Sequence, residues 1–152
     1  MRMVTNYNEN LNTKIMESET KKQDKPAYGP QVIYPKLSYD LNGILFKVHR
    51  ELGCFAREKQ YGDAIAKKLL EEDIKFEREV SIAGTGNILD FVIEGKIILE
   101  IKSERFITKD NYRQVQNYLQ QADLKLGILA NFRQKFLKPI RIIRIENNFS
   151  HE

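Results

Sequence analysis

Three charged residues interrupt two apolar runs between residues 87 and 103, in the stretch NILDFVIEGKIILEIKS. Asp90 stands in the first run, and Glu100 and Lys102 stand in the second. Removing an ionised carboxylate from water costs on the order of several kcal/mol unless a cation or strong hydrogen-bond donors compensate it. Any fold of this chain must therefore supply partners for these charges.

The pattern of charges indicates a metal-dependent site. Two carboxylates that are brought together repel each other, so one tends to keep a proton unless a metal ion neutralises both. Hard cations such as Mg²⁺ bind through one or two carboxylates, water and substrate phosphate. Lys102, two residues after Glu100, completes a set of side chains suited to phosphodiester cleavage.

The turn between the two runs decides whether this site can form. Side chains alternate along a strand, so Glu100 and Lys102 share one face. A two-residue turn would pair Asp90 with Leu99 and aim it away from Glu100. A three-residue loop at 94–96, or a bulge in either strand, would set Asp90 opposite Glu100. The metal-site hypothesis requires the loop or the bulge.

Length and composition allow one folded domain with a tail. The 152 residues are 41% apolar and 30% charged, as in ordinary soluble proteins. No apolar run is long enough to span a bilayer, and the start, MRMVTNYNENLN, has no apolar core resembling a signal peptide. We therefore expect a cytoplasmic protein without a membrane partner. The single Cys54 excludes an internal disulfide and indicates no zinc site.

The domain boundaries follow changes in composition. Residues 1–36 are rich in Asn, Lys, Glu and Thr, and we expect a flexible tail that could bind a protein partner. Residues 37–146 should form the folded domain, and 147–152 a C-terminal tail.

Positive charge gathers toward the end of the chain. The net charge is +4, and residues 124–145 contain six cations and no acid. A phosphate backbone would be attracted to such a segment, although a solvated protein face would look the same. The candidate nucleic-acid contacts are Lys125, Arg133, Lys135, Lys138, Arg141 and Arg144.

Helical periodicity predicts three helices. The first begins near Ser38, with Ser38 or Asp40 as its cap, and ends at Gly53; the others span residues 56–72 and 108–123. The expected inner stripes are Leu41, Leu45, Val48 and Leu52, then Tyr61, Ile65 and Leu69, then Tyr112, Val115, Leu119 and Ala122.

Five further segments have strand character. Residues 75–82, 87–93 and 96–102 should form an antiparallel meander, and residues 126–132 and 140–145 two later strands. The resulting fold class is an α/β sandwich with a mixed sheet of about five strands flanked by helices.

Further polar residues lie beside the predicted inner stripes. Glu58 shares a face with Tyr61, although an acid in the first helical turn is also explained by the helix dipole and nearby water. Gln114 and Tyr118 are four residues apart and can reach one partner, or can simply pack at the core boundary. His49 lies off its helix's stripe, and we expect a surface residue.

These motifs, in this order of elements, resemble the PD-(D/E)xK nuclease superfamily and its restriction-endonuclease-like core. Within it, residues 41–144 are similar to the small GxxExxY proteins. Asp90 matches the lone acid on the second strand, and the segment EIK, which ends at Lys102, matches (D/E)xK on the third. Gln114 and Tyr118 match the QxxxY of the RecB-like branch.

The ExxY signature of the small family falls on Glu58 and Tyr61. The family's Gly three residues before the Glu is Phe55 here, with Gly53 two residues earlier. The segment GILANF, residues 127–132, looks like the strand that follows the QxxxY helix in that family.

The resemblance implies a site and a chemistry. Asp90, Glu100 and the main-chain carbonyl of Ile101 would hold Mg²⁺ or Mn²⁺, with Glu58 holding a bound water or a second ion. Lys102 would position the attacking water or neutralise the phosphate, and Gln114 and Tyr118 would orient Lys102 or the DNA backbone. The implied activity is hydrolysis of phosphodiester bonds of DNA, and the motifs do not distinguish DNA from RNA.

Two other readings of the motifs stay open. A catalytically silent module could keep the fold and bind nucleic acid or a protein partner. Glu100 and Lys102 could instead form a simple ion pair on a solvated strand face, which would leave Asp90 unexplained. Cleavage of both strands of a duplex usually needs two active sites, so a homodimer is compatible with the nuclease reading.

Overall fold

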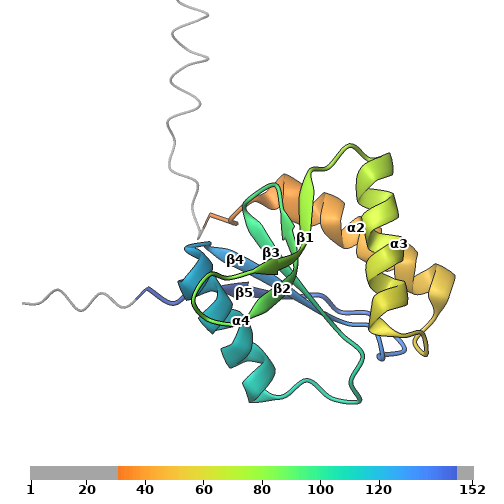
Figure 1. Ribbon diagram of the computed structural model, residues 1–152. Helices are drawn as coiled ribbons and strands as arrows, with labels where there is room; N and C mark the ends of the chain where they lie inside the picture. The colour runs from red at the N-terminus through yellow and green to blue at the C-terminus, as the bar shows by residue number, and fades with distance from the viewer. Residues whose placement is uncertain (1–30, 147–152) are drawn as a thin grey trace, which may run out of the picture. The chain divides into compact units, whose positions relative to one another are not determined.

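The computed structural model describes residues 31–146, and the predicted tails fall almost wholly outside this range (Figure 1). The order of elements is as the sequence predicts: two helices, three strands, a helix and two strands. The elements are α2 (Pro35–Leu52), α3 (Glu58–Glu71), β1 (Phe76–Ser81), β2 (Ile88–Ile93), β3 (Ile97–Lys102), α4 (Lys109–Ala122), β4 (Leu126–Asn131) and β5 (Ile140–Ile143).

The five strands form one mixed sheet whose spatial order is the chain order, β1 to β5. All neighbours pair antiparallel except β3 and β4, which are parallel and are joined through α4. Helices α2 and α3 pack on one face and α4 on the other (Figure 1). The predicted α/β fold, a mixed sheet of five strands flanked by helices, is confirmed.

The α2/α3 side holds the larger core. In α2, Leu41, Ile44, Leu45 and Val48 are fully buried at helical spacing, and Gly53 ends the helix with a φ of 71°. Both helices pack on the inner face of the central strands, where side chains of β2, β3 and β4 complete the core. These strand side chains are Phe91, Ile93, Ile97, Leu99, Ile101, Leu126, Ile128 and Ala130.

The core beneath α4 differs from the prediction in one position. Val115 and Leu119 are fully buried, as expected, whereas Tyr112 is 41% exposed and Tyr118 only 6% exposed. The inner stripe of α4 therefore turns toward Tyr118, which replaces Tyr112 in the core. The prediction that Tyr112 faces inward was wrong.

The start of α2 also differs from the prediction. The helix begins at Pro35, and Ser38 lies buried within it rather than capping it. The Ser38 hydroxyl donates to the Tyr34 carbonyl at 2.7 Å and accepts from Arg141 of β5 at 2.6 Å. Helix α3 likewise begins at Glu58 rather than Ala56.

The β2–β3 hairpin has the three-residue loop that the site requires. Ile93 pairs with Ile97 and Phe91 with Leu99, which leaves residues 94–96 as the loop. Glu94 and Gly95 have φ values of 52° and 63° in this tight turn, a region that glycine adopts without strain. Continuing the register sets Asp90 opposite Glu100.

Between residues 31 and 146, no helix is long and apolar enough to cross a membrane.

Candidate active site

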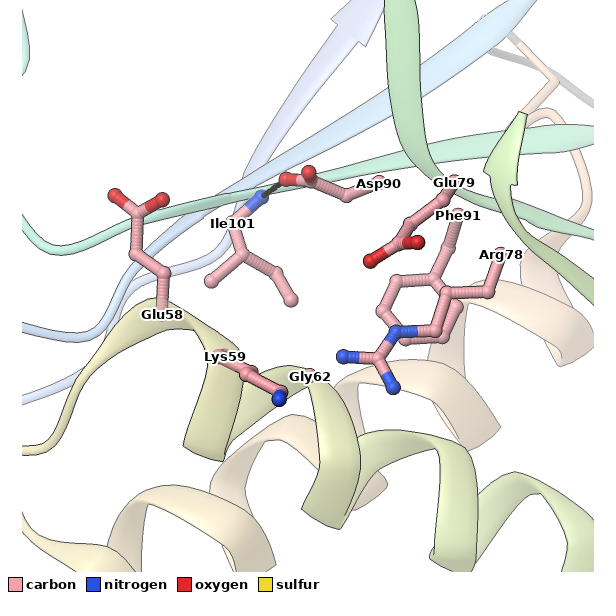
Figure 2. A pocket seen from close by; sticks show the side chains of 8 residues that line it. All are labelled: Glu58, Lys59, Gly62, Arg78, Glu79, Asp90, Phe91 and Ile101. Atoms are coloured by element: carbon pink, nitrogen blue, oxygen red, sulfur yellow. Dashed lines mark hydrogen bonds between the residues drawn. The ribbon is translucent and has the colours of Figure 1, made fainter. Parts of the chain in front are cut away.

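Strands β2 and β3 stop pairing where the charged residues begin. The last paired residues are Phe91 and Leu99, and the next position is occupied by Asp90 and Glu100. There the main-chain N–H of Ile101 donates to Oδ2 of Asp90 at 2.8 Å (Figure 2). The carboxylate of Asp90 thus satisfies a backbone donor of β3, which fixes the side chain at the point where the strands separate.

Glu100 is the least compensated polar side chain of this region. It is only 5% exposed, and its Oε2 has no hydrogen-bond partner within the described part of the chain. Burial, and then the negative charge of Asp90, raise the pKa of Glu100 to about 8, while the charge of Lys102 acts in the opposite direction. Glu100 therefore holds a proton over much of the neutral range.

Asp90 is half-buried, less deeply than Glu100, and its charge is better compensated. Burial raises its pKa, whereas the donated N–H of Ile101 and the positive charges of Lys102 and Arg78 lower it. Two carboxyl groups in one low-dielectric region resist ionising together, so the proton resides on Glu100. A divalent cation would compensate both groups at once.

Alternation along β3 places Glu100 and Lys102 on the α4 side of the sheet, as predicted, because Leu99 and Ile101 point into the α2/α3 core. On α4, Gln114 donates from Nε2 to the hydroxyl of Tyr118 at 2.8 Å. Burial and the charge of Glu100 raise the pKa of Tyr118. Gln114 and Tyr118 therefore bond to each other, and the tyrosine lies within electrostatic reach of the carboxyl pair.

Glu58 approaches from the opposite side of the sheet. It stands in the first turn of α3, and its Oε1 accepts from the main-chain N–H of Ser103 at 3.1 Å. This bond joins the start of α3 to the end of β3. Figure 2 shows Glu58 and Asp90 on two sides of Ile101.

Tyr61 shapes the chain that leads into α3. Its hydroxyl donates to the Gly53 carbonyl at 2.6 Å and accepts from the Ala56 N–H at 3.1 Å. Its ring stacks on Phe132 with centroids 4.3 Å apart. Gly53 makes the turn with positive φ, and Phe55 points to solvent with 80% of its surface exposed. Tyr61 therefore fixes the turn that precedes α3.

A cavity of about 260 Å³ opens beside Asp90, between α3 and the first two strands. Figure 2 shows its lining, which is Glu58, Lys59, Gly62, Arg78, Glu79, Asp90, Phe91 and Ile101. Arg78 pairs with Asp63 at 2.7 Å and lies over the ring of Phe91, 5.4 Å from its centroid. Sequence reasoning missed Arg78 and Glu79. The signal was a cation at an inward position of a strand, between Phe76 and Val80.

The carboxyl pair has the chemistry to bind a hard cation. Asp90 and Glu100 supply adjacent carboxyl oxygens, and Oε2 of Glu100 is buried without a partner. Within residues 31–146, however, no three His, Cys, Asp or Glu side chains are grouped as a metal site. Glu58 therefore does not join the carboxyl pair in such a group.

The six predicted phosphate contacts differ in their partners within the fold. Arg141 donates to Ser38 and to the Ile33 carbonyl, and Arg144 pairs with Asp123 at 2.6 Å and with Glu146. Arg133 and Lys135 lie in the loop between β4 and β5, over exposed aromatic rings. Lys125 and Lys138 are exposed.

The predicted surface residue His49 is half-buried. Its Nε2 lies 2.8 Å from the Gln134 carbonyl in the loop between β4 and β5.

Comparison with known proteins gives one match. A family model described as the PD-(D/E)XK nuclease superfamily matches residues 35–144, a range that contains every element from α2 to β5. Curated proteins and solved structures give no match. The matched range includes each of the predicted catalytic positions.

Proposed function

The chain belongs to the PD-(D/E)XK nuclease superfamily, and from this membership we propose that it is a metal-dependent nuclease that hydrolyses phosphodiester bonds of DNA. The observation that carries the proposal is the carboxyl pair at the split between β2 and β3. Glu100 is buried there beside Asp90 with an unpartnered oxygen, and Lys102 follows on the same strand face. Such an arrangement costs stability, and a catalytic role explains why the chain carries it.

Superfamily members generally use divalent metals. In this chain Asp90, Glu100 and the carbonyl of Ile101 would hold Mg²⁺ or Mn²⁺, with Glu58 reaching it through water. The ion would polarise the scissile phosphate and make a water more acidic. Glu100 releases its proton when a cation arrives, because the positive charge favours the ionised form.

The remaining residues act on the substrate. Lys102 neutralises the charge that gathers on the phosphoryl oxygens in the transition state. Gln114 and Tyr118 orient Lys102 or the DNA backbone from the α4 side. Of the basic residues, the exposed ones (Lys125, Arg133, Lys135 and Lys138) contact phosphates, whereas Arg141 and Arg144 brace the fold. Phosphate contacts position the substrate without reading its sequence.

We also assign the chain to the GxxExxY group and the RecB-like branch of the superfamily. Glu58 and Tyr61 support the first assignment, because each makes a hydrogen bond that helps to fix the start of α3. The hydrogen bond between Gln114 and Tyr118 supports the second.

A silent nuclease-fold module is the competing function. The observation that favours it is that Glu58 stands apart from Asp90 and Glu100. Among the described residues, no three acidic side chains therefore lie close enough together to form a metal site. Such a module would bind nucleic acid or a protein partner without cleaving it.

Cleavage of labelled single-stranded, duplex and branched DNA in Mg²⁺ or Mn²⁺ tests the proposal. Asp90→Ala and Lys102→Ala should each lower the cleavage rate by about 100-fold or more, because each removes a charge that acts on the transition state. Lys67→Ala, which removes an exposed cation of α3, should leave the rate unchanged. Cleavage that survives either site substitution would point to a contaminant or to another site. No cleavage by a folded wild-type protein would support the silent module.

A further inference from the structure

Three phenylalanines near the candidate site are displayed to solvent. Phe55 is 80% exposed, Phe106 69% and Phe136 72%. Each carries a cation over its ring, at 4.9 to 5.5 Å from the ring centroid. The pairs are Phe55 with Arg133, Phe106 with Arg105 and Phe136 with Lys135. Exposed large aromatics that recur with cations mark an interaction surface rather than an unfinished core.

The three rings belong to loops at the end of the sheet where β3 and β4 terminate. Phe106 lies four residues after Lys102, at the end of β3, and Phe136 follows β4. Because β3 and β4 are parallel, their following loops leave the sheet on the same side. Phe55 lies three residues before Glu58, whose carboxylate binds the loop after β3. Figure 1 shows these loops together beside the start of α3.

Hydrogen bonds anchor all three loops. Asn131 accepts from the Glu104 N–H at 3.0 Å and donates to the Glu104 carbonyl at 2.7 Å, which ties the loop after β3 to the end of β4. His49 holds the β4 loop through the Gln134 carbonyl, and Tyr61 holds the loop before α3 through Gly53. The rings are therefore presented on a braced scaffold, and a ligand would meet little ordering cost there.

We propose that this rim, defined by Phe55, Phe106 and Phe136 with their cations, binds an unpaired polynucleotide strand and feeds it to the carboxyl pair. Aromatic rings stack on base faces and the neighbouring cations pair with phosphates, which is the combination that single strands offer. A duplex buries its base faces and would meet only the cations. The inference deepens the proposed function by naming its substrate class, and its reference to the carboxyl pair rests on that function.

Binding of polynucleotide strands is measured with the full chain in EDTA, which prevents metal-dependent cleavage of the probe. The probes are labelled oligothymidylate, the same length of oligouridylate, a blunt duplex, and an abasic strand that keeps the phosphates without bases. Wild-type protein should bind the base-containing strands most tightly. Phe106→Ala and Phe136→Ala should each weaken that binding by about 5- to 150-fold, the range that one lost base stack gives. Oligouridylate and oligothymidylate separate RNA from DNA.

Three controls sharpen the measurement. Phe106→Trp keeps a stacking ring and should restore binding. Tyr39→Ala removes a ring that is 79% exposed near the other end of α2 and should change nothing. On the abasic strand, wild type and the Phe→Ala variants should bind alike, because the rings have no bases to contact.

Equal affinity of wild type for the abasic and base-containing strands would overturn the proposal, as would duplex binding as tight as strand binding. A folded Phe106→Ala protein that keeps full strand affinity would overturn the role of that ring. The outcomes are independent of the nuclease test: stacking in EDTA together with cleavage that ignores Asp90→Ala would keep the rim and reject the catalytic site.

Discussion

Glu100 and Asn131 are buried polar side chains on the neighbouring strands β3 and β4, and their surroundings differ. Asn131 is 2% exposed, and both its amide nitrogen and its amide oxygen are hydrogen-bonded, to the main chain of Glu104 and Arg133. Glu100 is 5% exposed, keeps an oxygen that has no partner among residues 31–146 and faces a second carboxyl group. A satisfied buried polar group stabilises a fold, whereas an unsatisfied one opposes folding. The contrast separates a residue that serves the structure from one that, under the proposed function, serves a ligand.

The largest expected effect is on the pH dependence of stability, measured by urea unfolding in EDTA. The pKa of Glu100 is raised in the folded state, so the folded protein binds its proton more tightly than the unfolded chain does. The free energy of unfolding should therefore fall as pH rises from about 4.5 to about 8, by about 3 to 5 kcal/mol in total. Asp90, whose pKa is also raised, adds to the fall.

The matched variant is Glu100→Gln, whose side chain cannot ionise. Its free energy of unfolding should decrease much less as pH rises, although Asp90, Lys102 and Tyr118 still face the position. Glu71→Gln, at an exposed position of α3, should keep the wild-type dependence. An unchanged pH profile in Glu100→Gln would remove the contrast with Asn131.

The second effect is stabilisation by magnesium. When the free Mg²⁺ concentration is 100 times the dissociation constant, an ion that binds only the native state raises the free energy of unfolding by about 2.7 kcal/mol. The melting temperature rises with it. Asp90→Ala should abolish the rise, which thermal denaturation measures. Asn131→Ala should keep it, because Asn131 is not among the proposed ligands. Loss of the rise in Asn131→Ala alone would reverse the assignment of the two roles.

The third effect is smaller and concerns stability alone. Asn131→Ala leaves the part-buried N–H and C=O of Glu104 without their partner, and should lower the free energy of unfolding by about 2 kcal/mol. Chemical denaturation measures the loss. Asn117→Ala, at an exposed position of α4, should stay within about 0.5 kcal/mol of wild type. If Asn131→Ala also stayed within about 0.5 kcal/mol of wild type, the hydrogen bonds of Asn131 would not brace the loops.

The smallest effect belongs to Glu58, the exposed member of the predicted metal set. Glu58→Gln keeps an acceptor for the Ser103 N–H, so the free energy of unfolding should change by less than about 0.5 kcal/mol. Cleavage should fall more than stability does if Glu58 serves the metal through water. Equal cleavage by Glu58→Gln and wild type would confine the site to Asp90, Glu100 and Lys102.

Periodicity was sufficient to predict most of the fold. The inner stripe of α3 and the meander were confirmed because a long amphipathic pattern has one favourable way to bury its apolar side. The start of α2 could not be predicted, because the hydroxyl of Ser38 can cap a helix or bond within it, and a partner 103 residues away, Arg141, decides between these roles. The register of Tyr112 and Tyr118 depended likewise on the sheet beneath α4.

The candidate site was predictable in composition and less so in arrangement. The anomaly of charges in apolar runs pointed to Asp90, and the required three-residue loop was confirmed. The bond from Ile101 to Asp90 was not foreseeable, because it depends on where β2 and β3 separate. The partners of two basic residues were also not foreseeable, because Arg141 and Arg144 bond to residues distant in sequence.

The agreement between strand order in the sheet and order along the chain has a kinetic consequence. Each strand pairs with its neighbour in sequence, so little loop-closure entropy delays assembly and folding should be fast for a sheet of this size. Asp90 and Glu100 meet first in a solvated hairpin, where water screens their repulsion. We expect α4 to cover β3 after the hairpin has formed, and burial then moves a proton onto Glu100. The cost of burying the carboxyl pair should therefore mainly accelerate unfolding and leave the folding rate little changed.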